Sequence, residues 1–204
     1  MNIDVERLKK YRINFAWGFF RLGALKVSKK KNTEAIFSFK ESLKLSREIM
    51  QEKKDSILYL NNLLYLSQIS SLTKDYVSSY TYNGELLKIL HDNYEKDIPR
   101  WKNDLNMSMM NQSFYSILLG KFSEGEQYSL EAIKVDSTKH IAYTNLAAAL
   151  LLQGKFEEAE KLYLEYKDEF KNSFIDDFAE FERLGVIPEE RKADVERIKA
   201  ILNE

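Results

Sequence analysis

The stretch LLQGKFEEAEKLY (residues 151–163) has a partial copy earlier in the chain, ILLGKFSEGEQYS (residues 117–129). Both contain Gly-Lys-Phe, and the two glycines, Gly120 and Gly154, are 34 residues apart. Apolar residues at helical spacing precede each glycine, and small and aromatic residues follow it at the same spacing. The pattern predicts a helix, a short turn at Gly-Lys and a second helix, with the glycine ending the first helix in a left-handed conformation.

The Gly-Lys pair allows a second interpretation, because phosphate-binding loops of the form GxxxxGK[ST] also contain it. In those loops the first glycine lets backbone amides wrap the phosphates, and the hydroxyl group holds magnesium. Here Tyr115 and Ala149 stand where the first glycine should be, and phenylalanine replaces the hydroxyl residue in both copies. We therefore interpret the pair as a helix-ending turn and predict no nucleotide site.

The composition favours long helices. The chain has 204 residues, of which 44% are hydrophobic and 31% charged, with only seven glycines and two prolines for tight turns. A chain of this length buries roughly 70% of the surface that its unfolded form exposes, so a sizeable core needs no crosslinks. Cysteine is absent, which excludes disulfides and thiolate metal ligands.

The helix-turn-helix unit resembles the tetratricopeptide repeat (TPR), a pattern of about 34 residues with aromatic, Leu, small, Gly and Ala positions at set places. The unit 140–173 carries the resemblance most fully, and the unit 106–139 matches at fewer places. Two earlier stretches, 19–46 and 63–89, fit the same template. The matching residues of the two later units are Tyr143, Leu146, Ala147, Leu150, Gly154, Phe156, Ala159 and Tyr163, and Met109, Gly120, Phe122, Gly125 and Ala132.

The resemblance implies an all-α fold, a right-handed α-solenoid of about four TPR-like helical hairpins in one domain, residues 1–204. The units start near positions 16, 60, 106 and 140, which are 44, 46 and 34 residues apart, so the first two repeats are elongated. Gly185 ends a later helix and Pro188 suits the start of another. The expected boundaries are repeats near 16–53, 55–95, 98–137 and 139–171, followed by capping helices over 173–203.

TPR arrays line a concave groove with the first helix of each repeat. The residues at those places form an apolar surface with amide groups and adaptable methionines, which suits a peptide with hydrophobic anchors. The implied function is a non-enzymatic scaffold that binds a protein or peptide segment. The open alternative is that the array itself covers this surface. The implied groove residues are Asn61, Tyr65, Met107, Met110, Asn111, Phe114, Ile117, Ile141, Thr144, Asn145, Ala148 and Leu151.

The sequence contains no signature of catalysis or metal binding. Motifs such as GxSxG and HExxH are absent. Adjacent carboxylates such as Asp176 and Asp177 point about 100° apart on a helix, so they do not converge as an acid and a base must. His91 and Glu95 have a spacing compatible with metal ligation, but no third ligand is indicated. We predict neither enzymatic activity nor a resident cofactor or metal.

Charge is uneven along the chain, although its net value is −1. Residues 1–31 carry nine Lys or Arg and two acids, whereas residues 155–204 carry nine bases and fifteen acids. Solvated helix faces explain both ends. The alternatives are a basic end that binds an acidic partner, or a homo-oligomer in which the basic end of one copy meets the acidic end of another.

A regulator that senses a small ligand in the groove is a third hypothesis for the function of the chain.

The near-neutral net charge argues against a protein that coats nucleic acid. The most apolar N-terminal stretch, INFAWGFFRLGALKV (residues 13–27), contains Arg21 and Lys26 and fits neither a signal peptide nor a membrane span. The sequence therefore predicts no nucleic-acid partner, no membrane insertion and a cytoplasmic location, unless the chain is a fragment of an exported or anchored protein.

Overall fold

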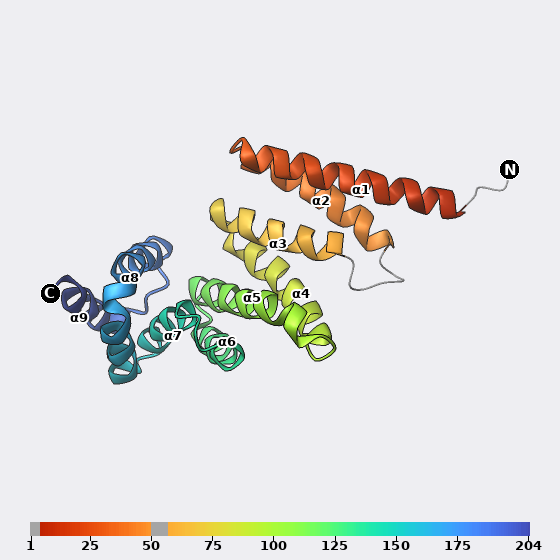
Figure 1. The fold of residues 1–204 in the computed structure, drawn as a ribbon. Coiled ribbons are helices and arrows are strands. Elements are labelled where there is room, and N and C mark those ends of the chain that lie inside the picture. Colours follow the sequence, from red (N-terminus) through yellow and green to blue (C-terminus); the bar gives the residue numbers. More distant parts are fainter. Residues whose placement is uncertain (1–4, 50–56) are drawn as a thin grey trace. The chain divides into compact units, whose positions relative to one another are not determined.

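The computed structural model describes residues 5–49 and 57–204, and every regular element in these ranges is a helix (Figure 1). The predicted all-α fold is therefore confirmed. The chain divides into two compact units, Met1–Asp97 and Ile98–Glu204. Unit 1 contains α1 (Val5–Ser28), α2 (Asn32–Ile49), α3 (Ile57–Leu72) and α4 (Tyr76–Tyr94). Unit 2 contains α5 (Ile98–Leu118), α6 (Phe122–Val135), α7 (Ile141–Leu152), α8 (Phe156–Leu184), η1 (Glu189–Arg191) and α9 (Lys192–Asn203).

The same turn ends the first helix of the α1–α2, α3–α4, α5–α6 and α7–α8 hairpins. At the α5–α6 turn the amide of Lys121 donates to the carbonyl of Ser116 at 2.9 Å, and the amide of Gly120 donates to that of Ile117 at 2.9 Å. This pair of bonds is the Schellman motif, which needs a residue with positive φ. That residue is Lys30 (57°), Lys74 (62°), Gly120 (74°) or Gly154 (82°).

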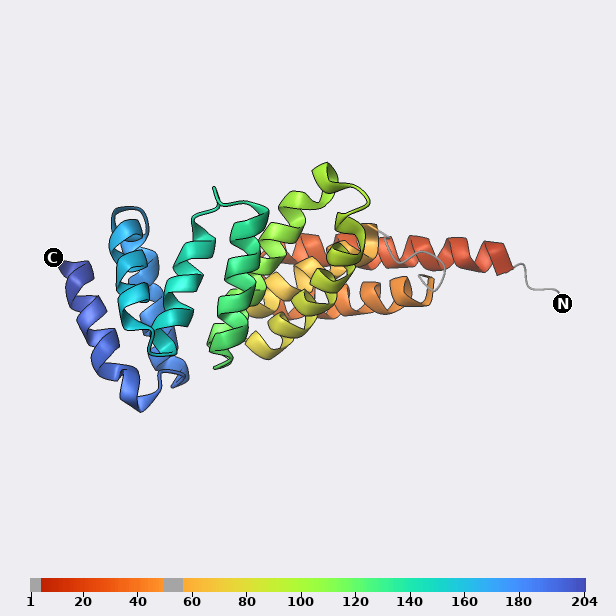
Figure 2. The same ribbon diagram turned by 90° about the horizontal axis from the view of Figure 1, so that it is seen from below.

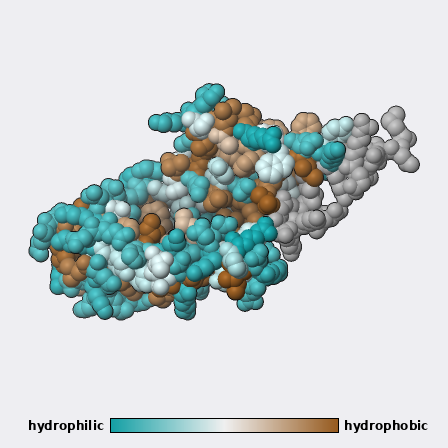
Figure 3. All heavy atoms as spheres, viewed as in Figure 1, coloured by the Kyte–Doolittle hydropathy of each residue, from teal (hydrophilic) through white to brown (hydrophobic). Residues whose placement is uncertain are grey.

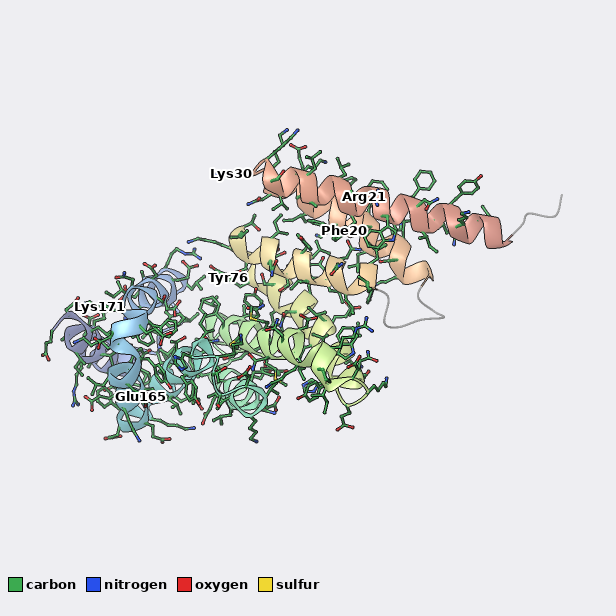
Figure 4. The ribbon with its side chains drawn as sticks, viewed as in Figure 1. Phe20, Arg21, Lys30, Tyr76, Glu165 and Lys171 are labelled. Atoms are coloured by element: carbon green, nitrogen blue, oxygen red, sulfur yellow. The ribbon has the colours of Figure 1, made fainter. Side chains whose placement is uncertain are left out.

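These four turn positions are 44, 46 and 34 residues apart, which is the spacing predicted for the unit starts. The predicted left-handed conformation of Gly120 and Gly154 is confirmed. Lys30 lies at the tip of the α1–α2 hairpin in Figure 4. The hairpin turn is thus the feature that recurs along the chain, whether or not its residue is glycine.

In unit 1 the first hairpin packs closely because a glycine meets an aromatic ring. A Cβ atom at Gly23 of α1 would lie 2.8 Å from the ring of Phe39 on α2. The fully buried Phe39 ring also packs on Phe20 and Tyr65, with centroid distances of 5.5 and 5.1 Å. Phe20 lies on the side of α1 that faces α3 (Figure 4). The aromatic cluster of Phe20, Phe39 and Tyr65 therefore joins α1, α2 and α3.

Buried polar groups add a second connection between the same three helices. The hydroxyl of Ser42 on α2 donates to the carbonyl of Ala16 on α1 at 2.7 Å. The side-chain amide of Asn62 on α3 donates to the Ser42 hydroxyl at 2.9 Å. Because a buried polar group without a partner is costly, this chain of bonds fixes the register in which the three helices pack.

In unit 2 the helices α6, α7, α8 and α9 stand side by side (Figure 2). The α5–α6 hairpin is close at Gly125, where a Cβ atom would lie 2.7 Å from Cγ1 of Ile117. The hydroxyl of Ser113 donates to the carbonyl of Gly125 at 2.8 Å. Only Ile141 and Tyr143 of the apolar helix α7 are not buried. Helix α7 is therefore the central core element of this unit.

The predicted boundary between the fourth repeat and the capping helices is wrong. Helix α8 runs without a break from Phe156 to Leu184, so the expected repeat end near 171 and the expected cap start at 173 both fall inside it. Neither glycine nor proline interrupts this stretch, and its buried aromatic residues keep helical spacing on both sides of position 172. Gly185, at φ 66°, ends the helix as predicted.

The other predicted boundaries can be compared helix by helix. The repeats near 55–95 and 98–137 correspond to the α3–α4 and α5–α6 hairpins. The first repeat was expected from position 16, but α1 begins at Val5, and the expected end near 53 lies outside the described residues. The right-handed solenoid stays a prediction.

The outer surfaces of the two units differ in hydropathy. On the face shown in Figure 3, hydrophobic residues gather over α1 and α3, whereas α8 and α9 are mostly hydrophilic. On α1, the side chains of Phe15, Leu22 and Leu25 are 64%, 41% and 51% exposed. Even so, none of the helices within residues 5–49 and 57–204 combines the length and hydropathy needed to cross a bilayer.

Candidate functional site

Unit 2 contains a groove of about 260 Å³ formed by α5, α7 and α8. Side chains of the three helices reach it, and most of the lining residues are those that the TPR resemblance places on a concave face. The predicted residues in the groove are Met107, Met110, Asn111 and Phe114 of α5 and Ile141, Thr144 and Asn145 of α7. Helix α8 adds Phe170, Ser173 and Asp177, which the sequence analysis did not include.

The groove has an exposed apolar rim and a buried floor. On the rim, the side chains of Met107 and Ile141 are 44% and 50% exposed, and Phe114 is half-buried. On the floor, Met110 and Asn145 are buried. The side chains most open to solvent are therefore a flexible methionine, which can adapt to the shape of a ligand, and a branched aliphatic residue.

One hydrogen bond of the floor joins α5 and α7, and a second lies within α7. The side-chain amide of Asn145 donates to the backbone carbonyl of Met110 at 2.9 Å. The hydroxyl of Thr144 donates to the carbonyl of Ile141 within α7 at 2.9 Å. The Asn145 amide group thus has a structural partner on α5, and its contribution to the groove is to position the two helices.

Asp177 is the one ionisable residue among the groove-lining side chains. It lies on α8 and is half-buried, and its neighbour Asp176 is exposed. Burial, and to a smaller degree the charge of Asp176, raise the pKa of Asp177 from 3.8 to about 7. Burial is also the main cause that raises the pKa of the nearby Tyr163 well above its ordinary value, with the charge of Asp177 adding to it.

Three predicted groove residues belong to the core and do not line the groove. Ile117 and Leu151 are fully buried and Ala148 is 4% exposed. Ile117 packs against Gly125 of α6, on the face of α5 that closes the hairpin. The prediction assumed that residues three or four positions apart on α5 share one face of the helix. In the structure the face that contains Ile117 is turned toward α6 and not toward the groove. A partner in the groove does not reach these side chains.

Asn61 and Tyr65, the remaining predicted residues, belong to α3 of unit 1 and do not line the groove of unit 2. Tyr65 is half-buried in the aromatic cluster, with its ring 5.4 Å from that of Phe20. Asn61 is half-buried. The packing of Tyr65 against two phenylalanines gives it a structural role in unit 1.

Phe170, Ser173 and Asp177 were not predicted as groove residues, because the repeat template ends at about this point. A signal was nevertheless present. The aromatic residues Tyr163, Phe170, Phe174 and Phe178 continue the helical period across the expected boundary without a helix breaker. This helical spacing alone would have predicted that α8 continues past residue 173 and that its second half can line the groove.

A second hollow of about 480 Å³ lies at the α8–α9 turn, and the charged residues of its lining pair with one another or with a neighbour. Lys192 pairs with Glu189 at 2.6 Å, and Lys199 of α9 pairs with Glu196 at 2.9 Å and with Glu182 of α8. These pairs connect the last turn and its flanking helices. The charges that line this hollow are thus engaged within the chain.

The histidines have local partners or exposed positions. The Nδ1 atom of His140 lies 2.8 Å from a carboxylate oxygen of Glu169, and its ring packs on that of Tyr166 at 5.3 Å. His91 and Glu95 are both exposed at the end of α4. In the ranges that the structure describes, His, Asp and Glu side chains do not gather in threes in a way that could hold a metal ion.

Of the comparisons with known proteins, only the one with solved structures gave matches. No family model matches the chain, and no curated protein matches it. Among solved structures, the crystal structure of BtubC (BKLC) from P. vanneervenii is similar, with a TM-score of 0.58 and 15% sequence identity over 99% of this chain and 93% of that one. At this identity the likeness shows a shared all-helical fold and says nothing of function.

Proposed function

We propose that this chain is a non-catalytic interaction module of the TPR type, whose groove in unit 2 binds a segment of another protein. The observation that carries the proposal is the open apolar rim formed by Met107, Phe114 and Ile141 over a buried floor. Solvent-exposed apolar side chains on α5 and α7 cost solvation free energy in the free protein, and a bound segment with hydrophobic anchors removes that cost.

The size of the groove favours side chains of a peptide over a whole small molecule. Pockets for drug-sized ligands have volumes of roughly 300–1,000 Å³ and enclose most of the ligand. The groove has about 260 Å³ and is open to solvent along Met107 and Ile141. One or two anchor side chains fit this space while the rest of the segment runs along the rim. The small-ligand regulator is for this reason the weaker hypothesis.

The proposal is tested by selecting a random 12-residue phage-displayed peptide library on the immobilised chain and measuring the affinity of enriched peptides. We expect the double variant Met107→Ser/Ile141→Ser to lose binding by about tenfold or more, because each exposed anchor contact contributes about 1 kcal/mol or more. The matched control is Leu130→Ser/Leu164→Ser, since these side chains outside the groove are similarly exposed, at 43% and 54%. Peptides that bind both double variants equally would contradict the proposal.

A second candidate function is self-association, and one observation favours it. Five exposed large apolar side chains of α1 are three, four or seven residues apart, a spacing that places them on one helical face. Helix α1 carries six bases and one acid, whereas α8 carries ten acids and four bases. We propose α8 of a second copy as the complementary partner of this face. The residues of this face are Leu8, Tyr11, Phe15, Leu22 and Leu25.

Sedimentation velocity tests this second candidate. If the two helices associate, the dimer should weaken as the Debye length falls from about 10 Å at 0.1 M salt to about 3 Å at 1 M salt. Phe15→Ser should weaken it further, because Phe15 is 64% exposed on the apolar face of α1. Phe37→Ser is the matched control, since Phe37 is 61% exposed on α2. A monomer at every salt concentration would refute self-association.

A further inference from the structure

Asp177 is an acid of α8 that is half-buried in the groove and has no partner. Four acidic residues of this helix are engaged by bases elsewhere in unit 2 or on the helix itself. These pairs are Glu160 with Arg197 at 3.2 Å, Glu169 with His140 at 2.8 Å, Glu180 with Arg183 at 2.6 Å, and Glu182 with Lys199. The carboxylate of Asp177 forms neither a hydrogen bond nor an ion pair with any described residue.

The position of Asp177 makes this lack of a partner costly. It is half-buried in the groove, where five of the nine other lining residues are apolar or aromatic, while Asp176, one residue earlier, is exposed to water. A carboxylate that is removed from water without a hydrogen-bond donor or a cation loses solvation free energy. The rise in its pKa reports the same cost, since it means that the charged form is disfavoured.

The charge around the groove restricts what can relieve that cost. Helix α8 has ten acidic and four basic residues, a net charge of −6, and the groove-lining residues of α5 and α7 are uncharged. The residues that line the groove include neither a lysine nor an arginine. A cation from outside the chain therefore enters a negative field and meets an acceptor that is already partly dehydrated.

Lysine and arginine side chains match both parts of the site. Their aliphatic stems pack on apolar surface while their charged ends reach a polar group. In the groove the stem would lie along Met107, Phe114 and Phe170 and the charged end would reach α8. We propose that the Asp177 carboxylate accepts hydrogen bonds from a lysine or arginine of the bound segment, so that the groove selects segments in which a basic residue accompanies a hydrophobic one. This inference rests on the proposed peptide-binding function.

The acids of the second hollow differ from Asp177 because each of them is paired with a lysine. At the α8–α9 turn, Glu182, Glu189 and Glu196 are also acidic, but lysines of the same unit pair with each of them. A basic segment would have to displace those lysines before it could bind there. The carboxylate of Asp177 has no lysine partner to be displaced, so a basic segment can bind in the groove directly.

The first test is the peptide selection described above, repeated on Asp177→Asn and Asp176→Asn. The first variant removes the charge in the groove and keeps the side-chain shape, and the second removes the same charge one residue away on an exposed position. We expect lysine and arginine to be enriched in peptides selected on the wild type and on Asp176→Asn, and to return to library frequency on Asp177→Asn. Circular dichroism confirms that each variant is folded.

The second test measures the pair directly. The most enriched peptide is synthesised with its basic residue intact and with a neutral replacement, citrulline for arginine or norleucine for lysine, and its dissociation constant is measured on the wild type and on Asp177→Asn. Loss of either charge should weaken binding about tenfold or more, because a charge-assisted hydrogen bond contributes about 1.5–3 kcal/mol. Loss of both should weaken it no further, since the two changes remove one interaction.

The outcomes separate this inference from the proposed function. Hydrophobic peptides that bind the wild type and Asp177→Asn equally, and lose affinity only in Met107→Ser/Ile141→Ser, would overturn the role of Asp177 and leave the groove as a binding site. Basic peptides that bind the wild type, Asp176→Asn and Asp177→Asn with equal affinity would overturn the role of Asp177 as well. The absence of any peptide that depends on Met107 and Ile141 would overturn both proposals.

Discussion

Units 1 and 2 use the same helix-ending turn but place different residues in it. In unit 1 the left-handed positions are Lys30 and Lys74, and in unit 2 they are Gly120 and Gly154. A residue with a Cβ atom pays about 1–2 kcal/mol in this conformation, whereas glycine does not. The Schellman hydrogen bonds form in both units nevertheless. Packing between the two helices of each hairpin therefore determines the turn, and glycine only lowers its cost.

The two units also hold their first hairpins by different means. In unit 1 a glycine on the first helix, Gly23, receives the ring of Phe39 from the second helix. In unit 2 a glycine on the second helix, Gly125, receives Ile117 from the first, and Ser113 bonds to its carbonyl. Both solutions bring helices close together through a missing side chain. Unit 1 fills the space with an aromatic cluster, and unit 2 with an aliphatic and hydroxyl contact.

The largest expected effect tests whether each aromatic core is essential. Phe39→Ala in unit 1 and Phe178→Ala in unit 2 should each lower the free energy of unfolding by about 3–5 kcal/mol, because each removes a fully buried ring and leaves a cavity. Urea denaturation followed by circular dichroism measures this change. Phe37→Ala, at a 61% exposed position of α2, is the control and should change it by about 0.5 kcal/mol or less. A similarly small effect of Phe39→Ala would show that the cluster is not the core of unit 1.

The next effect concerns unit 2 alone and depends on pH. The pKa of Asp177 is raised to about 7, so between about pH 4 and 7 the folded state holds a proton that the unfolded chain has released, and stability falls as pH rises through this window. Asp177→Asn cannot titrate. It should therefore be about 2–4 kcal/mol more stable than the wild type at pH 8 and nearly equal to it below pH 4.

Thermal and urea unfolding at pH 4, 6 and 8 checks the expected trend for Asp177→Asn. The difference from the wild type isolates Asp177 from other groups that titrate in this range. Asp176→Asn serves as the control, because its carboxylate is exposed and should show a much smaller trend. A stability difference that is the same at pH 4 and pH 8 would contradict the environment assigned to Asp177.

A smaller effect distinguishes the two glycine turns of unit 2. Gly120→Ala should cost about 1–2 kcal/mol, because the space around an added Cβ is open and only the left-handed backbone is strained. Gly154→Ala should cost more, because the added Cβ would lie 2.4 Å from Cζ of Arg191 and would displace the guanidinium from Asp194. The excess should be about 1 kcal/mol or less, since that ion pair is partly exposed. Equal costs at the two positions would show that Arg191 moves freely.

The smallest effect is expected when the left-handed residue of a unit 1 turn is replaced by glycine, the residue that unit 2 has at this place. Lys30→Gly should raise the free energy of unfolding by up to about 1 kcal/mol, because the relief of left-handed strain exceeds the added entropy of the unfolded chain. Lys29→Gly is the control. Lys29 does not have a positive φ, so glycine there should lower stability by about 0.5–1 kcal/mol. If both substitutions destabilise equally, the strain assigned to Lys30 is absent.

Local signals explain why the hairpins of unit 2 were the easier part to predict. Gly120 and Gly154 mark their turns through a property of the residue alone, its freedom to adopt positive φ, and the boundaries of the α5–α6 hairpin followed from them. Lys30 and Lys74 carry no such signal, so the hairpins of unit 1 were predicted only from the fit of residues 19–46 and 63–89 to the repeat template. The end of the fourth repeat was predicted wrongly because a repeat template replaced the unbroken helical period of α8.

The amino-acid pattern was sufficient for the helices, most of their turns and the residues that share a helical face, because these depend on interactions between near neighbours in the chain. It did not indicate which face meets solvent. Met107 and Ile141 line an open rim, whereas Ile117 and Leu151 are buried, and contacts among α5, α6, α7 and α8 make that difference. The same holds for Asp177, since a carboxylate becomes dehydrated and unpartnered only when helices distant in sequence pack around it.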